Sequence, residues 1–160
     1  MNVPNKAKGF TIIEVVLVLA IAGLIFLVVF LALPALQRGQ RDNQRKQDLG
    51  KFMSQATAYQ SNNQGNLPAD QTAWNNFETA YLTNNNAAFA DPSDGTTYTI
   101  TRAAAAPTNN IPAPGVHTII VYPGMGCGTG ALTGTYSGAS RTFAAVIYQE
   151  QGAFTCQQNN

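Results

Sequence analysis

A long run of apolar residues near the start of the chain dominates its pattern of hydrophobic and polar positions. No ionisable side chain occurs from Val15 to Leu36. As a helix this segment rises about 33 Å, which matches the hydrocarbon core of a bilayer. The pattern therefore predicts a membrane-length helix over residues 10–36. Glu14 lies at its head, where removing a carboxylate from water is costly and demands a compensating partner.

The polar sequence after this run carries a second helical pattern. Five apolar residues recur at the i, i+3, i+4, i+7 spacing of an amphipathic helix: Leu49, Phe52, Met53, Ala56 and Tyr59. We therefore expect the helix to continue over residues 37–61 with one face against a folded domain. Pro34 lacks an amide hydrogen and clashes with the carbonyl four residues earlier, which predicts a kink or local melting around Phe30.

The remaining residues, 62–160, predict one globular head domain. A short helix with Trp74, Phe77 and Tyr81 on one face comes first. Segments rich in β-branched and aromatic residues then predict strands near residues 96–102, 116–122, 142–149 and 153–156. In succession they suggest an antiparallel meander that buries one face against the helix. The predicted fold class is α+β, with a long N-terminal helix packed on an antiparallel sheet of three or four strands.

The residues at the start of the apolar run form the most specific motif in the chain. They are Gly9, Phe10 and Thr11, followed by two aliphatic residues and Glu14. This motif resembles the N-terminal signature of type IV pilins and pseudopilins. The resemblance implies that residues 1–9 are a leader cut between Gly9 and Phe10, and that the new amine of Phe10 is methylated. It also implies that Glu14 pairs with the terminal amine of a neighbouring subunit during assembly.

The resemblance carries expectations about function, partners and location. It implies a structural subunit of an extracellular type IV pilus-like filament, serving adhesion, motility or DNA uptake through the fibre. The expected partners are copies of the chain itself, a prepilin peptidase, the assembly machinery and, before assembly, the membrane. The expected location is the inner membrane as a single-pass precursor, then a surface filament. In this family the proline usually lies three residues before the position of Pro34.

Other classes of protein remain open alternatives at this point. A pseudopilin of a type II secretion system carries the same signature. A monomeric membrane-anchored binding module, or a plain signal anchor, has an apolar run of the same length. Retention of residues 1–9 in the mature chain, with no polymer formed, favours the binding module.

Charged residues make up only 11% of the chain, and their distribution is uneven. Basic residues follow the apolar run closely: Arg38, Arg41, Arg45, Lys46 and Lys51. We expect these to form a collar facing solvent or lipid headgroups, rather than contacts between subunits. The region after Lys51 is mildly acidic and has no obvious nucleic-acid footprint. More basic residues follow the run than precede it, so the positive-inside rule does not support a cytoplasmic leader, and the resemblance alone implies that orientation.

Two cysteines, Cys127 and Cys156, predict a disulfide in an exported domain, with two free thiols as the alternative. A zinc site is poorly supported, because there is no CxxC pair and His117 is far from both cysteines in sequence. Asp91 and Asp94 lie in a strong turn signal and are weak candidates for calcium, since the pattern falls short of an EF-hand.

The glycine-rich segment 124–130 lacks the Gly-Lys-Ser/Thr ending of a P-loop, which favours a flexible loop tethered by the disulfide. No nucleophile with an adjacent base and no metal-ligand cluster is visible in the sequence. We therefore predict that the chain is not an enzyme and has no cofactor or metal.

Overall fold

The computed structural model describes residues 9–83, 89–107, 115–128, 132–134, 141–150 and 152–159. Its elements are α1 (Ile12–Asn62), α2 (Gln71–Phe77), the π-helix η1 (Glu78–Leu82), β1 (Thr99–Arg102), β2 (Thr118–Pro123), β3 (Met125–Cys127), β4 (Leu132–Gly134), β5 (Phe143–Tyr148) and β6 (Phe154–Gln158). The chain divides into two units, residues 1–39 and 40–160. The second unit is called the head below.

The long helix α1 is continuous from Ile12 to Asn62, so the residues around Phe30 are helical. Pro34 lies inside the helix. The local melting predicted around Phe30 is therefore wrong, whereas a kink at Pro34 stays a prediction. The C-terminal end of α1 agrees with the expected end near Ser61, and the chain then turns through Gln64 and Gly65, both with positive φ.

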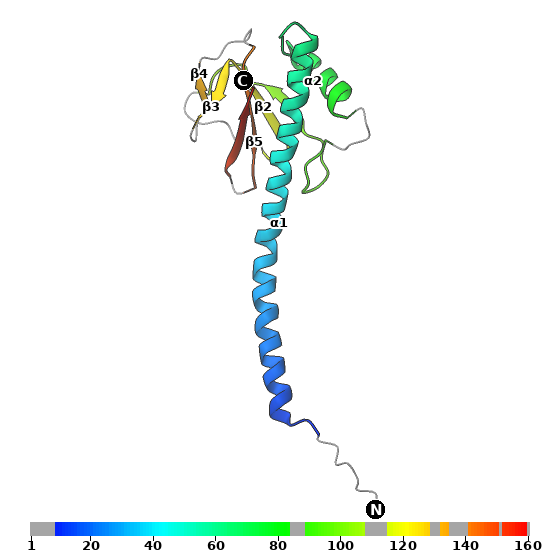
Figure 1. Cartoon of the computed structure of the whole chain (residues 1–160), viewed down its shortest axis with the longest axis vertical. Coiled ribbons are helices and arrows are strands. Elements are labelled where there is room, and N and C mark those ends of the chain that lie inside the picture. The colour runs from blue at the N-terminus through cyan, green and yellow to red at the C-terminus, as the bar shows by residue number, and fades with distance from the viewer. Residues whose placement is uncertain are drawn as a thin grey trace, which may run out of the picture. The chain divides into compact units, whose positions relative to one another are not determined.

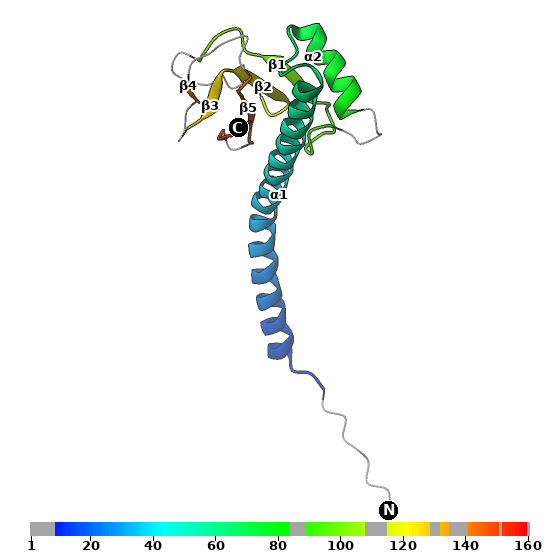
Figure 2. The same ribbon diagram turned by 45° about the horizontal axis from the view of Figure 1, so that its top comes forward.

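Within the head, α1 packs on a four-stranded sheet in the order β1-β2-β5-β6. The predicted helix stripe is buried: Leu49, Phe52, Met53 and Ala56 join one core with the inward side chains of β2 and β5, while Tyr59 is partly buried against it. Trp74 and Phe77 of α2 complete this core, and α2 lies beside the C-terminal part of α1 (Figures 1 and 2). The α+β class and the packing of helix on sheet are confirmed.

The sheet is mixed, which corrects the expected antiparallel meander. β2, β5 and β6 pair antiparallel, but β1 runs parallel to β2. Parallel neighbours need a crossover of about a dozen residues or more. Residues 103–117 supply a connection of that length between β1 and β2. The strands lie in the segments rich in β-branched residues, as predicted. The direction of β1 relative to β2 depends instead on the path of residues 103–117, which the residue pattern does not indicate.

The second face of the sheet is covered as well. Ile120, Tyr122, Val146 and Tyr148 form a second buried cluster with Met125, and Leu132 packs against it. β3 and β4, which carry Met125 and Leu132, pair antiparallel. Strands buried on both faces appear as continuous apolar runs, as β2 and β5 do. The flexible loop expected over residues 124–130 is therefore wrong at β3, which holds part of this core.

A side-chain cap begins the short helix α2. The side chain of Asp70 accepts a hydrogen bond from the Ala73 N–H at 2.8 Å and so caps the first turn. After Phe77 the chain continues as η1. Phe77 and Tyr81 stack with ring centroids 5.2 Å apart, so the aromatic residues pack as part of the core.

Candidate functional site

Thr11 and Glu14 form a reciprocal cap at the first turn of α1. The Thr11 N–H donates to Glu14 Oε2 at 2.8 Å, and the Thr11 hydroxyl donates to the same oxygen at 2.7 Å. The Glu14 N–H lies 3.4 Å from Thr11 Oγ1. This arrangement is a capping box, for which Ser or Thr followed three residues later by Glu is the sequence signal. The carboxylate thus has polar partners at the helix start, where the helix dipole also favours negative charge.

Phe10 directly precedes this cap and is 89% exposed. Among the residues the structure describes, the exposed large hydrophobic side chains all lie between Phe10 and Leu36. Of the helices formed by the described residues, α1 is the one long and apolar enough to cross a membrane. Exposed apolar surface of this extent marks contact with a membrane or another protein. The first unit therefore requires a partner outside its own fold.

In the head, Cys127 and Cys156 are joined by a disulfide, with their Cα atoms 5.8 Å apart. The bond links β3 to β6. It encloses a loop with a sequence separation of 29, for which the chain-entropy model gives about 3–4 kcal/mol of stabilisation.

The basic collar predicted after the apolar run is wrong for two of its members. Arg45 is fully buried and its guanidinium donates to both oxygens of Asp91, at 2.6 and 2.7 Å. It also donates to Asp42 at 2.7 Å and to Glu150 at 3.2 Å. Arg41 donates to both oxygens of Glu150, at 2.5 and 2.8 Å. These five residues form what we call the ionic cluster.

Other members of the predicted collar differ among themselves. Arg38 and Lys46 are exposed as expected. Lys51 is half-buried, with its Nζ 5.7 Å from the centre of the Phe89 ring. That distance is within the range of a cation–π contact. The basic segment thus contributes to the fold of the head as well as to its surface.

The ionic cluster shifts the acidities of its carboxyl groups. Hydrogen bonds from Arg41, and then from Arg45, lower the pKa of Glu150 to about 2, against the opposing effect of desolvation. At Asp91 burial acts to raise the pKa, but the hydrogen bonds from Arg45 and Ser93 outweigh it and the pKa is lowered. Both carboxylates are therefore held in their charged form.

The turn predicted at residues 91–95 is present, because the Gly95 N–H donates to the Asp91 carbonyl at 2.9 Å. Asp91 and Asp94 are both in this turn, as the calcium alternative requires. The carboxylate of Asp91 is engaged by Arg45 and by the N–H and hydroxyl of Ser93. This arrangement offers calcium fewer oxygen ligands than the six to eight it prefers.

Sequence reasoning missed two features that have local signals. The Thr-x-x-Glu spacing from Thr11 to Glu14 predicts the capping box. Arg45 lies four residues before Leu49, which places it on the buried stripe of the helix. By contrast, the partners of Arg45 at Asp91 and Glu150 are 46 and 105 residues away in sequence.

The match to a known protein family lies in the N-terminal part of the chain, where the capping box and the exposed apolar helix are found. Residues 4–30 match the family described as the prokaryotic N-terminal methylation motif. No curated protein and no solved structure matches the chain. The motif implies processing by a prepilin peptidase, and together with the apolar helix it fits a membrane-anchored precursor. The chain thus carries the prepilin signature of type IV pilins and pseudopilins.

Proposed function

We propose that the mature chain, residues 10–160, is the structural subunit of an extracellular type IV pilus-like filament. The observation that carries the proposal is the set of exposed large apolar side chains from Phe10 along α1 to Leu36, with Glu14 in the first turn of the helix. A lone membrane anchor needs the apolar length and can use Glu14 as a helix cap, but it needs no Gly9-Phe10 junction directly before that helix. Packing such helices in a filament core covers this surface after it leaves the lipid.

Processing prepares this helix for assembly. We propose that the peptidase cuts between Gly9 and Phe10 and that the amine of Phe10 is then methylated. Cleavage removes residues 1–9 and creates a positive charge on Phe10, the residue immediately before the capping box. Each mature subunit then carries a positive amine at Phe10 and a negative carboxylate at Glu14.

In the filament Glu14 pairs with the terminal amine of Phe10 on a neighbouring subunit. Two opposite charges that meet in apolar surroundings offset each other's loss of hydration when the geometry is good. Removing one partner leaves the other unpaired and is more harmful than removing both. The pair therefore sets the register between helices, whereas apolar contacts along the helix supply most of the attraction. The proposal gives the chain no enzymatic role.

Replacement of Glu14 tests this function directly. We expect Glu14→Ala to abolish surface filaments, while export, leader cleavage and the stability of the head stay unchanged. Val18→Ala is the matched control, since Val18 lies one turn further along the same helix and carries no charge. Electron microscopy of sheared fibres measures assembly, and mass spectrometry of the N-terminus measures cleavage and methylation.

Three results would contradict the proposal. A normal yield of fibres from Glu14→Ala would show that the charge pair does not direct assembly. A native chain that still begins at Met1 would favour a membrane-anchored binding module instead. Cleaved chains that form only short periplasmic assemblies would favour the pseudopilin alternative, which shares the motif.

A further inference from the structure

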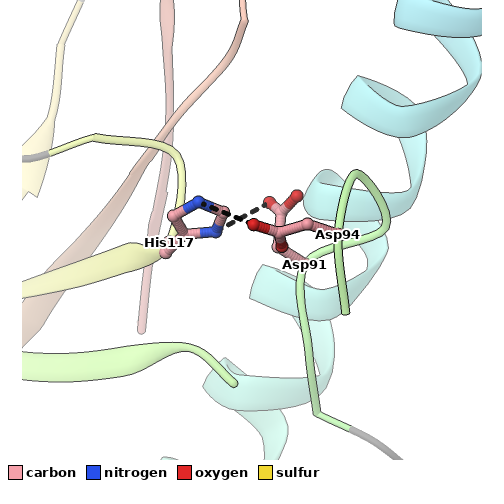
Figure 3. Close-up of side chains that lie close together, drawn as sticks. All are labelled: Asp91, Asp94 and His117. Carbon is pink, nitrogen blue, oxygen red and sulfur yellow. Dashed lines mark ion pairs between the residues drawn. The ribbon is translucent and has the colours of Figure 1, made fainter. Parts of the chain in front are cut away.

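Three side chains with metal-binding atoms meet on the head, away from the N-terminal motif. Asp91 and Asp94 come from the turn before β1, and His117 directly precedes β2. One nitrogen of the imidazole and one oxygen of each carboxylate lie within 4.8 Å of one another. His117 Nδ1 is 4.0 Å from Asp91 Oδ2, and Nε2 is 3.5 Å from Asp94 Oδ2. Figure 3 shows the ring facing both carboxylates.

Asp91 is held rigidly, yet it keeps capacity to bind. Its side chain is fully buried, and Oδ1 accepts from Arg45 and from both the N–H and the hydroxyl of Ser93. Oδ2 accepts from Arg45 Nε and is also the oxygen nearest His117. Oδ2 accepts this one hydrogen bond among the described residues, so it is the carboxylate oxygen with room for a further partner. Carboxylates that bind metals are usually oriented by such hydrogen bonds from the surrounding residues.

His117 supplies the observation that points to a ligand. Its Nδ1 is buried and has no hydrogen-bond partner in the part of the chain that the structure describes. A buried polar atom without a partner costs free energy, which a bound ion would recover. Asp94 is oriented in a similar way to Asp91, because its Oδ1 accepts from the Thr96 N–H and leaves Oδ2 toward the ring.

The charge around these residues favours a cation. The two arginines of the ionic cluster are surrounded by the carboxylates of Asp42, Asp91 and Glu150, and Asp94 adds a further negative charge. These four carboxylates outnumber the two arginines, so the region is net negative. The positive charge of Arg45 is shared among three carboxylates and so repels an incoming cation only weakly.

We infer that Asp91, Asp94 and His117 bind a first-row transition-metal ion, with Zn²⁺ as the best match. Imidazole nitrogen suits zinc, copper and nickel, whereas calcium takes oxygen ligands. Zinc bonds to such ligands are about 2.0–2.2 Å long, so the three donors must close around the ion. The side chains of Asp94 and His117 are 51% and 36% exposed and have room to move toward the buried Asp91. Three protein ligands would leave the fourth position of a tetrahedral zinc ion to water.

The test uses the full-length chain in detergent micelles, produced without a polyhistidine tag. His117 is the single histidine of the sequence, so ring NMR resonances report this site alone. We expect one equivalent of Zn²⁺ to shift these resonances and to raise the melting temperature of the head, while Ca²⁺ at the same concentration does neither. Isothermal titration calorimetry measures the affinity.

Matched variants separate ligation from general charge effects. We expect His117→Gln and Asp94→Asn each to weaken Zn²⁺ binding by at least about tenfold, since loss of even an outer partner typically costs about 10–100-fold. Asp70→Asn removes an exposed carboxylate elsewhere while asparagine still caps α2, and should bind Zn²⁺ like the parent. Ring resonances unmoved by excess Zn²⁺, or undiminished binding by His117→Gln, would overturn the inference.

Discussion

Residues 12–39 and 40–62 belong to the same helix but differ in whether their large apolar side chains are exposed or buried. In the first segment the large apolar side chains are exposed. In the second, a narrow stripe that includes Leu49, Phe52 and Met53 is buried against the sheet and α2. Helical conformation alone therefore does not determine what a segment contacts. A helix that is apolar on all sides requires an environment supplied from outside, whereas a striped helix finds its partner within its own chain.

The two segments contribute to different equilibria. Burial of the stripe stabilises the folded head, at about 25 cal/mol for each Å² of apolar surface removed from water. The surface of residues 12–39 gives the same gain only when lipid or another subunit covers it. Substitutions in residues 40–62 should therefore change the stability of the head. Substitutions in residues 12–39 should instead change contact with lipid or with other subunits.

The largest contrast is expected from truncating one apolar side chain in each segment. Phe52 is fully buried and packs edge-on against Phe77, with ring centroids 6.0 Å apart. We expect Phe52→Ala to destabilise the head by about 3–5 kcal/mol. Leu24→Ala, on the exposed segment, should leave that stability unchanged. Urea unfolding followed by fluorescence of Trp74, the single tryptophan, measures both; equal losses would refute the division of roles.

A second contrast compares two arginines of the basic segment. Arg45→Met leaves the buried carboxylate of Asp91 without its main partner, and we expect a loss of about 3–5 kcal/mol. Arg38 is exposed, so Arg38→Met should change the unfolding free energy by no more than about 0.5 kcal/mol. The same Trp74 fluorescence assay applies. A small effect at Arg45 would mean that solvent reaches Asp91 and replaces the arginine.

The smallest effect should appear on acidification. The pKa of Glu150 is about 2 in the fold, against an ordinary value of 4.5. A lowered pKa stabilises the fold above the ordinary value, and this contribution disappears as the pH falls from about 4.5 through about 2. We expect the unfolding free energy to decline over that window, and the decline to be shallower in Glu150→Gln. Because Glu150 is partly exposed, solvent limits the size of this effect.

The parts of this structure that follow from local patterns could be predicted from the sequence. The apolar run, the stripe from Leu49 to Ala56 and the β-branched segments each carry their own periodicity, and the helix and the four strands of the sheet lie where expected. The parallel direction of β1 depends on a connection whose path has no periodic signal. The burial of Arg45 depends on Asp91 and Glu150, which only the completed fold brings together.

The same limit applies to the cluster of Asp91, Asp94 and His117. The two carboxylates share one turn and are visible as neighbours in the sequence. His117 reaches them because β1 and β2 lie side by side in register, with Thr99 opposite Thr118. Without that register the single histidine has no evident relation to the turn.

The position of Arg45 four residues before Leu49 also makes α1 sensitive to the number of its residues. Each residue rotates the helix by about 100°. Insertion or deletion of one residue between Arg45 and Leu49 would turn the arginine away from Asp91 or turn the stripe away from the sheet, whatever residue type is involved. The fold of the head should therefore tolerate a change in helix length before Arg41 or after Asn62, but not between Arg45 and Leu49.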